Sequence, residues 1–244
     1  MSTILVSGAA SGLGLAFLKA YASTDTPTTL IAIDKDPIPT EEIKHGNEGS
    51  KLFTHQIDIT SQSSIDEMVS KISNLPIDMI IHSAGIRGLV PSQEDVHPGD
   101  VAACETLSVM DLDTLLRTFH INVAGTFMLV RALLPNLKHS PASKVIVMSS
   151  RMGSVGQNTS GSAYAYRASK AALNATIKSL SLDVPEVSFV LCHPGRVETN
   201  LVRCKEEGAI SADESVQGLL PLIAKWNEED TGKFYDRFGD PILW

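Results

Sequence analysis

The sequence predicts an α/β fold in which a parallel β-sheet is covered by helices on both faces. Short runs of β-branched and apolar residues alternate with longer stretches in which apolar residues recur at helical spacing. Several of the short runs are apolar at consecutive positions, which is typical of strands that are buried on both faces. Repeated alternation of strand and helix indicates parallel pairing through right-handed crossovers.

Each expected element has its own place in this alternation. The expected strands are Thr3–Val6, Thr29–Ile33, Leu52–Ile57, Ile77–Ile81, Lys144–Met148 and Val187–Cys192. The expected helices are roughly Leu13–Ala22, Ser63–Ser73, Tyr164–Leu182 and, with a break or bend inside it, Asp111–Lys138. The expected loops are Lys35–Ser50, Ile86–Leu107, Arg151–Ser162 and Leu201–Ala212. A final short strand and a tail are expected in Gly232–Trp244.

Length and composition are those of one globular domain spanning residues 1–244. Hydrophobic residues make up 43% and charged residues 20% of the chain. The net charge of -8 argues against nucleic acid and membrane surfaces as partners, because both are bound by basic patches. A phosphate-bearing cofactor stays compatible with this charge, since backbone N–H groups can hold it.

The cysteines and the N-terminus predict a cytoplasmic protein. Cys104, Cys192 and Cys204 are far apart, odd in number and without metal-ligand spacing, so we expect reduced thiols and no metal site. Met-Ser-Thr leads directly into an apolar strand pattern, without the charged region and cleavage site of a secretory signal. No uncharged run is long enough to predict a membrane-spanning helix.

A glycine-rich turn follows the first expected strand and opens the first expected helix. Gly8, Gly12 and Gly14 are spaced Gly-x3-Gly-x-Gly, so the backbone can turn tightly and approach a pyrophosphate. The N-terminus of the following helix would direct free N–H groups and its positive dipole end at that phosphate. By itself such a turn is a weak signal, and its position at the first strand–helix junction strengthens it.

Two aspartates lie at the ends of the second and third expected strands. Asp34, twenty residues after Gly14, can accept hydrogen bonds from the adenosine ribose hydroxyls. Asp58 can bond the adenine amino group. A structural interpretation stays open for both: Asp34 as a turn residue, and Asp58 as an Asx turn or a helix cap, to which Thr60 or Ser61 is equally suited.

The stretch from Ser149 to Lys170 carries the strongest indication of chemistry. Tyr166 and Lys170 are four residues apart, so on a helix they share one face. A phenol titrates near pH ~10, and a neighbouring ammonium favours the phenolate and lowers that pKa. Ser150 follows an expected buried strand at the sheet edge where open α/β sheets bind ligands.

Taken together, these motifs resemble the short-chain dehydrogenase/reductase family over nearly the whole chain. The matching residues, in order, are Gly8-x3-Gly12-x-Gly14, Asp58, Ala84-Gly85, Asn122, Ser150, Tyr166-x3-Lys170 and Pro194-Gly195-x-Val197-x-Thr199. The segment 149–174 and the tail are most similar to the sniffer-like and C-factor-like branch of carbonyl reductases. The resemblance implies a doubly wound, Rossmann-type domain with about seven strands.

The resemblance also implies a role for each matching residue. Tyr166 would exchange a proton with a carbonyl or alcohol oxygen, Ser150 would hydrogen-bond that oxygen, and Lys170 would bind the nicotinamide ribose and lower the pKa of Tyr166. Asn122 would hold a water that relays protons from Lys170. The residues implied to bind the cofactor are Gly8, Ser11, Gly12, Leu13, Gly14, Asp34, Asp58, Ile59, Ala84, Gly85, Tyr166, Lys170, Pro194, Val197 and Thr199.

The chain departs from the family pattern at His82-Ser83 and in the sixteen-residue gap between Ser150 and Tyr166, which is longer than in many members, and it offers competing residues at two positions. His82-Ser83 stands where the family has an Asn pair, and we interpret His82 as a hydrogen-bonded structural residue ahead of a catalytic base. Ser149 competes with Ser150, which is preferred because it stands three residues before Gly153. Tyr164 competes with Tyr166, but it is six residues from Lys170 and off the shared helical face.

The residues around the second strand predict NAD(H) as the preferred cofactor, with NADP(H) still possible. The 2′-phosphate of NADP lies near the end of that strand, where Asp34 would repel it. Ser11 stands where many NADP-preferring relatives have a basic residue. Lys35 is adjacent but is expected to point away, because successive residues in a strand alternate in direction.

The predicted function is hydride transfer between a nicotinamide dinucleotide and a ketone, an aldehyde or a secondary alcohol. Two alternatives stay open: redox-neutral cyclisation or dehydration, and a catalytically silent dinucleotide-binding regulator. The expected partner is a small-molecule carbonyl or alcohol. A homo-oligomer, dimer or tetramer, is expected through the helices Asp111–Lys138 and Tyr164–Leu182.

Overall fold

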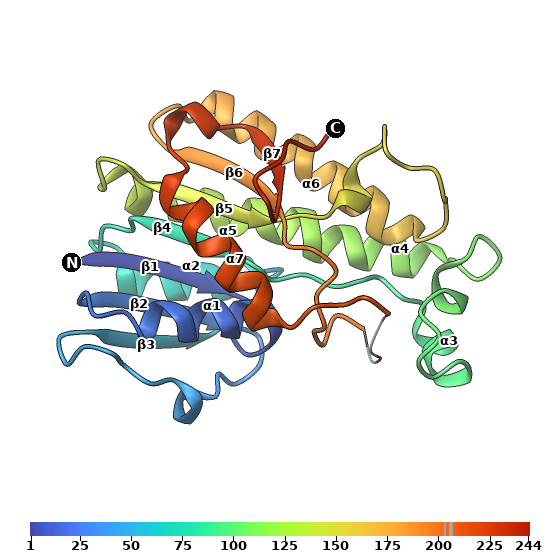
Figure 1. Ribbon diagram of the computed structural model, residues 1–244, viewed down its shortest axis with the longest axis horizontal. Coiled ribbons are helices and arrows are strands. Elements are labelled where there is room, and N and C mark those ends of the chain that lie inside the picture. The colour runs from blue at the N-terminus through green and yellow to red at the C-terminus, as the bar shows by residue number, and fades with distance from the viewer. Residues whose placement is uncertain (203, 205–206) are drawn as a thin grey trace.

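Seven parallel strands form one sheet in the order β3-β2-β1-β4-β5-β6-β7 in the computed structural model, which describes residues 1–202, 204 and 207–244 (Figure 1). The strands are β1 (Ser2–Ser7), β2 (Thr28–Asp34), β3 (Lys51–Gln56), β4 (Met79–His82), β5 (Lys144–Met148), β6 (Ser188–His193) and β7 (Lys233–Asp236). From β1 the chain winds outward to β3, then returns beside β1 to form β4. The winding direction therefore reverses between β1 and β4, the point at which such sheets bind ligands.

Helices cover both faces of the sheet, as the sequence predicts. One face packs against α1 (Gly12–Ala22) and α7 (Ala212–Lys225). The other packs against α2 (Gln62–Ile72), α5 (Thr126–Lys138) and α6 (Tyr164–Asp183), with α4 (Leu112–Phe119) beside α6. The short α3 (Pro91–Val96) projects from one end of the molecule (Figure 1). This is the doubly wound fold that the sequence predicts.

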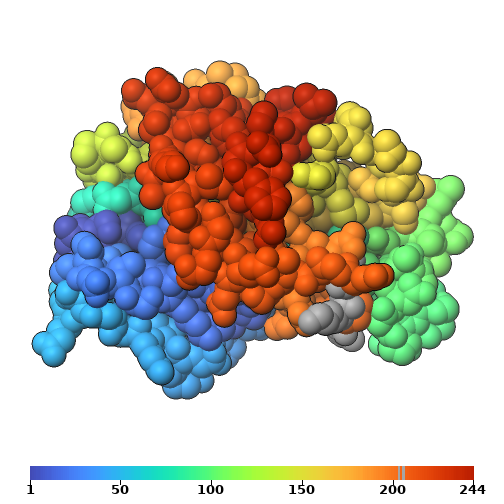
Figure 2. Space-filling view, in the orientation of Figure 1, coloured from blue at the N-terminus to red at the C-terminus, as the bar shows by residue number. Residues whose placement is uncertain are grey.

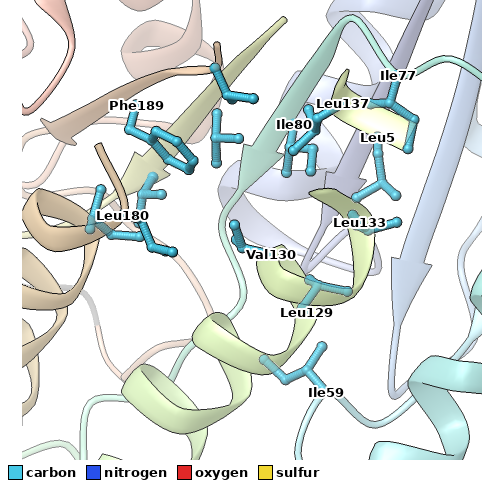
Figure 3. Packing of buried hydrophobic residues seen from close by; sticks show 14 of the residues in the cluster. Leu5, Ile59, Ile77, Ile80, Leu129, Val130, Leu133, Leu137, Leu180 and Phe189 are labelled. Atoms are coloured by element: carbon cyan, nitrogen blue, oxygen red, sulfur yellow. The ribbon is translucent and has the colours of Figure 1, made fainter. Parts of the chain in front are cut away.

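Side chains of the central strands alternate between the two cores. In β1, Leu5 belongs to the cluster beneath α2, α5 and α6, whereas Ile4 and Val6 belong to the cluster beneath α1 and α7. Figure 3 shows Leu129 and Leu133 of α5 among the side chains of the first cluster. Burial on both faces explains why these strands are apolar at consecutive positions. The edge strand β3 is mostly exposed.

The helical stretch 112–138 is interrupted, and this confirms the predicted break. A π-helical turn, His120–Gly125, separates α4 from α5. Pro135 lies inside α5 without ending it, so the interruption is not at the proline. Turns of this kind occur frequently at functional sites.

Several boundaries and one helix differ from the predictions. The strand predicted from Ile77 begins at Met79, because the Ile77 N–H bonds the carbonyl of Asn136 instead of a neighbouring strand. Helix α7 was not predicted, although Val216, Leu219 and Ile223 recur at helical spacing and are buried. Gly218 and Pro221 obscure that pattern, since both residue types disfavour helix interiors.

Some predicted loops contain short ordered turns. Segment 86–107 holds α3 and a 3₁₀ turn, Ala103–Glu105. The prediction for Leu201–Ala212 falls partly outside the described residues, at positions 203, 205 and 206. Within the described parts of the chain, no helix has both the length and the apolarity needed to cross a bilayer.

Candidate active site

A cleft of about 540 Å³ opens at the carboxyl ends of β1, β2, β4, β5 and β6. Figure 2 shows the segment after β6 (orange) between the N-terminal part of the chain (blue) and segment 86–107 (green). Fourteen of the predicted cofactor-binding residues line the cleft together with Ser150. The exceptions are Gly14, from the cofactor-binding set, and Asn122, from the catalytic set. The topology therefore gathers residues from the whole sequence into one site.

The glycine turn lines the cleft, and at each of its three glycines a side chain would be sterically unfavourable. Gly8 and Gly12 have φ of +70° and +53°, which side chains rarely adopt. A Cβ on Gly14 would lie 2.0 Å from the carbonyl oxygen of Gly8. Only glycine therefore allows the start of α1 to pack this closely against the turn. The side chain of Ser11 makes no capping hydrogen bond to α1. The turn and the N-terminus of α1 thus fit the pyrophosphate of a dinucleotide.

The two aspartates hold the cleft wall through hydrogen bonds to the backbone. Asp34 accepts from the N–H groups of Ala10 (2.9 Å) and Asp36 (3.0 Å). Asp58 accepts from the N–H (2.8 Å) and hydroxyl (2.7 Å) of Thr60, and these bonds lower the pKa of Asp58. Asp58 therefore forms an Asx turn, and Ser61 caps α2 by accepting from Ser64 N–H. Both carboxylates nevertheless line the cleft.

Tyr166 and Lys170 lie side by side on α6, as their spacing predicts. Lys170 Nζ is 5.7 Å from the centroid of the Tyr166 ring, and both side chains are buried. Tyr164, by contrast, is 38% exposed and does not line the cleft. Lys170 donates to the Met148 carbonyl (2.9 Å), and desolvation lowers the pKa of Lys170 to about 8. The shared face of α6 and the hydrogen bond to Met148 thus place the Lys170 ammonium beside the Tyr166 ring.

The two serines that compete at the end of β5 have different surroundings. Ser150 Oγ accepts from Met152 N–H (3.2 Å) and keeps its own proton available for donation into the cleft. Ser149 Oγ donates to Asn174 Oδ1 on α6 (2.5 Å), in the interior. The geometry therefore favours Ser150 as the group that meets a substrate oxygen.

Asn122 lies in the π-helical turn, behind the cleft. Its Oδ1 accepts from Ile86 N–H (2.8 Å), and its Nδ2 donates to Ile86 O (2.9 Å) and Ser169 Oγ (3.0 Å). A Cβ on Gly85 would lie 3.0 Å from Asn122 Oδ1 and 3.8 Å from Lys170 Nζ, so these groups converge on one point. The amide braces the segment after β4, while the relay water stays a prediction.

His82 has the surroundings of a structural histidine. Its Nδ1 bonds the Ser7 hydroxyl and its Nε2 the Thr126 hydroxyl, both at 2.8 Å. Complete burial lowers the pKa of His82 to about 3, so the ring is neutral. The ring links β1, β4 and α5 at the position of the family's Asn pair, and it does not line the cleft.

The segment after β6 closes the cleft at its far side. Pro194, Val197 and Thr199 line it, and a Cβ on Gly12 would meet the Thr199 side chain at 3.0 Å. Val197 pairs with Ile210 in an isolated parallel bridge. This segment therefore packs directly on the glycine turn.

Two residues at the site carried no signal in the sequence. Arg87 lies with its guanidinium carbon 4.8 Å from the Tyr166 ring centroid, and Glu105 holds it in a buried ion pair. Their spacing predicts no contact, because both lie in the predicted loop Ile86–Leu107 and match no motif. Arg151, the residue after Ser150, pairs with Asp236 at 3.2 Å.

Comparison with known proteins identifies the family. Residues 2–209 match the family model described as short chain dehydrogenase. The chain belongs to this family. Among relatives, the C-signal protein of Myxococcus xanthus is 38% identical over 69% of this chain and 93% of its own length. The short chain dehydrogenase gsfK of Penicillium aethiopicum is 30% identical over 100% of this chain and 99% of its own length.

Solved structures agree with this assignment. The carbonyl reductase Sniffer of D. melanogaster has a TM-score of 0.83 and 28% identity, with 100% of both chains covered. A carbonyl reductase from Pseudomonas aeruginosa PAO1, solved in complex with NADP, has a TM-score of 0.78 and 25% identity, also with 100% of both chains covered. The chain is accordingly a short-chain dehydrogenase: a nicotinamide-dependent oxidoreductase that acts on C=O or CH–OH groups.

Proposed function

We propose that this dehydrogenase interconverts ketones or aldehydes and alcohols with Tyr166 as the acid–base residue. The observation that carries the proposal is the pair of Tyr166 and Lys170, buried side by side in the wall of the cleft beside Ser150. A bound nicotinamide supplies or accepts the hydride. The chain itself must then deliver one proton to, or remove one from, the substrate oxygen.

Lys170 prepares Tyr166 for this task. A buried ammonium beside the phenol stabilises the phenolate, so the proton leaves Tyr166 more readily than it leaves tyrosine in water. Lys170 is also placed to bind ribose hydroxyls, since it lines the cleft with its Nζ near Gly85. Ser150 donates to the substrate oxygen and fixes its direction. Thr199 and the backbone near Val197 orient the nicotinamide carboxamide.

A substrate panel tests the function. Aldehydes, ketones and secondary alcohols are mixed with reduced or oxidised cofactor, and cofactor absorbance is followed. Net change of the cofactor with at least one member, lost in Tyr166→Phe, is the expected result. Product formation without cofactor change would instead support redox-neutral chemistry. Cofactor binding without any reaction across the panel would support a silent regulator.

For the cofactor itself, we propose a preference for NAD(H). Asp34 lies in the cleft wall at the end of β2, and its carboxylate is fixed by Ala10 and Asp36. A fixed carboxylate pairs with ribose hydroxyls and repels a 2′-phosphate. The P. aeruginosa relative was solved in complex with NADP. For this chain, the carboxylate of Asp34 argues for NAD(H) instead.

Replacing Asp34 tests this preference. In Asp34→Arg the ratio of kcat/KM for NADPH to that for NADH is expected to rise by about 10- to 100-fold, because a guanidinium pairs with the phosphate. Asp34→Asn is the matched control, because it keeps an acceptor for Ala10 N–H and loses the charge. It should reduce the preference for NADH over NADPH without reversing it. An unmodified enzyme that prefers NADPH would disprove the proposal and point to Lys35, which also lines the cleft.

We also propose that α5 and α6 pair with a second copy of the chain. Val123, Phe127 and Leu180 line a shallow hollow between these helices. Leu112 and Leu116 on the neighbouring α4 are exposed, and exposed apolar groups of this extent suit an interface. Light scattering at micromolar concentration should give twice the chain mass or more; a monomer would end this idea.

A further inference from the structure

The guanidinium of Arg87 lies against the ring of Tyr166. Its Cζ is 4.8 Å from the ring centroid, nearer than Lys170 Nζ at 5.7 Å. Arg87 belongs to the segment after β4, whereas Tyr166 and Lys170 belong to α6. Two cations from different elements therefore contact the same phenol ring.

Glu105 holds Arg87 with both carboxylate oxygens. Nε donates to Oε2 (2.9 Å) and Nη2 to Oε1 (2.8 Å), and the two side chains are 12% and 8% exposed. A two-pronged bond of this kind fixes the plane of the guanidinium as well as its position. The Glu105 carbonyl also accepts from Ala163 N–H and Ser162 Oγ, both at 3.0 Å. Glu105 thus anchors Arg87 and the turn that starts α6.

A further contact connects Arg87 to the serine of the site. Its Nη1 donates to Met152 Sδ (3.2 Å), and Met152 N–H donates to Ser150 Oγ (3.2 Å). One buried ion pair therefore contacts the tyrosine and reaches the segment that carries the serine. Burying two charges costs desolvation energy, and in some proteins a buried ion pair is retained because it fixes one geometry.

We propose that Arg87, clamped by Glu105, is a positioning residue that fixes the Tyr166 ring in the cleft and favours its phenolate. The inference deepens the proposed function, since it rests on Tyr166 as the acid–base residue. A cation over the face of an aromatic ring is attracted to its electrons, and the phenolate is richer in electrons than the phenol. The guanidinium contacts the ring directly, with Cζ 4.8 Å from the ring centroid, while Glu105 binds the guanidinium through Nε and Nη2.

The other groups that face this ring are few among the described residues. Lys170 faces it from α6. His193 lines the same cleft from β6, but burial lowers the pKa of His193 to about 4, so it is uncharged at neutral pH. Among the described residues, the charges placed against this ring are therefore those of Lys170 and of Arg87, the latter paired with Glu105.

Titration of the phenol tests the proposal without any substrate. Phenolate absorbance of the cofactor-free protein is measured against pH, and the titration of the same protein carrying Tyr166→Phe is subtracted. Tyr21 and Tyr235 have a raised pKa through burial, and the subtraction removes them with Tyr164. In Arg87→Met/Glu105→Leu, which removes both charges, the pKa of Tyr166 should rise by about one unit. The surface pair Lys138→Met/Glu186→Leu is the matched control and should leave it unchanged.

A second variant keeps the test decisive if the double variant does not fold. Glu105→Gln keeps the size of the side chain and one accepting oxygen for the guanidinium and removes the negative charge, so the pKa of Tyr166 should fall. Kinetically, Arg87→Met/Glu105→Leu should lower kcat by about tenfold at neutral pH while NADH affinity stays unchanged. A folded double variant with an unchanged Tyr166 pKa, or a rise in Glu105→Gln, overturns the proposal. Activity that survives Tyr166→Phe would instead overturn the proposed function and leave the titration readable.

Discussion

Tyr166→Phe is expected to lower kcat by about 10²- to 10⁴-fold, the range that proton transfer by a positioned side chain contributes. The change removes one hydroxyl from a buried ring that packs against Arg87 and Lys170. The ring itself remains, so the packing of α6 and the affinity for NADH should be preserved. Stopped-flow measurement of hydride transfer with the best substrate of the panel, and a separate binding titration with NADH, check both halves.

Tyr164→Phe is the matched control for this variant. It removes the same hydroxyl two residues earlier on the same helix, from a side chain that is half exposed and outside the cleft. Its activity should equal that of the unmodified enzyme. Loss of activity in Tyr164→Phe together with full activity in Tyr166→Phe would reverse the assignment of the acid–base residue.

Lys170→Met is expected to impair binding and chemistry together. It removes charged hydrogen bonds to the nicotinamide ribose, so the Kd for NADH should rise by about 10- to 100-fold. It also removes the cation beside Tyr166, so kcat at saturating cofactor should fall further than in Ser150→Ala. An unchanged Kd would eliminate the ribose-binding half of the role, and an unchanged kcat at saturation would eliminate the other half.

The same variant has a signature in stability. Burial lowers the pKa of Lys170 from 10.5 to about 8, so between these values the unfolded chain holds a proton that the folded chain has lost. The stability of the cofactor-free protein therefore gains a contribution as pH rises through this window, on the order of 1–3 kcal/mol in total. The difference in unfolding free energy between the unmodified protein and Lys170→Met should change accordingly from pH 8 to 10. A flat difference would show that Lys170 is not desolvated.

A structural feature can be predicted from the sequence when residues close to one another in the chain determine it. Consecutive apolar residues in β1, β2 and β5 predicted strands that are buried on both faces. The spacing of four residues between Tyr166 and Lys170 predicted that they share one face of a helix. The break in 112–138 was predicted, but its form as a π-helical turn around Asn122 was not. Helix α7 was missed because Gly218 and Pro221 contradict local propensity, and packing against α1 overrides it.

The choices between competing residues divide in the same way. The preferences for Ser150 over Ser149 and for Tyr166 over Tyr164 came from spacing alone, and the structure adds the reason, because Ser149 is bonded to Asn174 and Tyr164 faces outward. For Asp58 the sequence left two roles open, and the fold shows an Asx turn with the carboxylate still on the cleft wall.

The sequence by itself determined the family and the alternation of strands and helices apart from α7, and it supplied the candidate site residues, because each of these depends on local spacing and residue type. Only the tertiary structure decided which loop residues reach the site. Arg87 and Glu105 are eighteen positions apart, and Tyr166 is far from both in sequence. Their contact arises from the way segment 86–107 folds back on the start of α6. A bond between distant side chains leaves no periodicity in the sequence, since it depends on where whole elements lie and not on the neighbours of either residue.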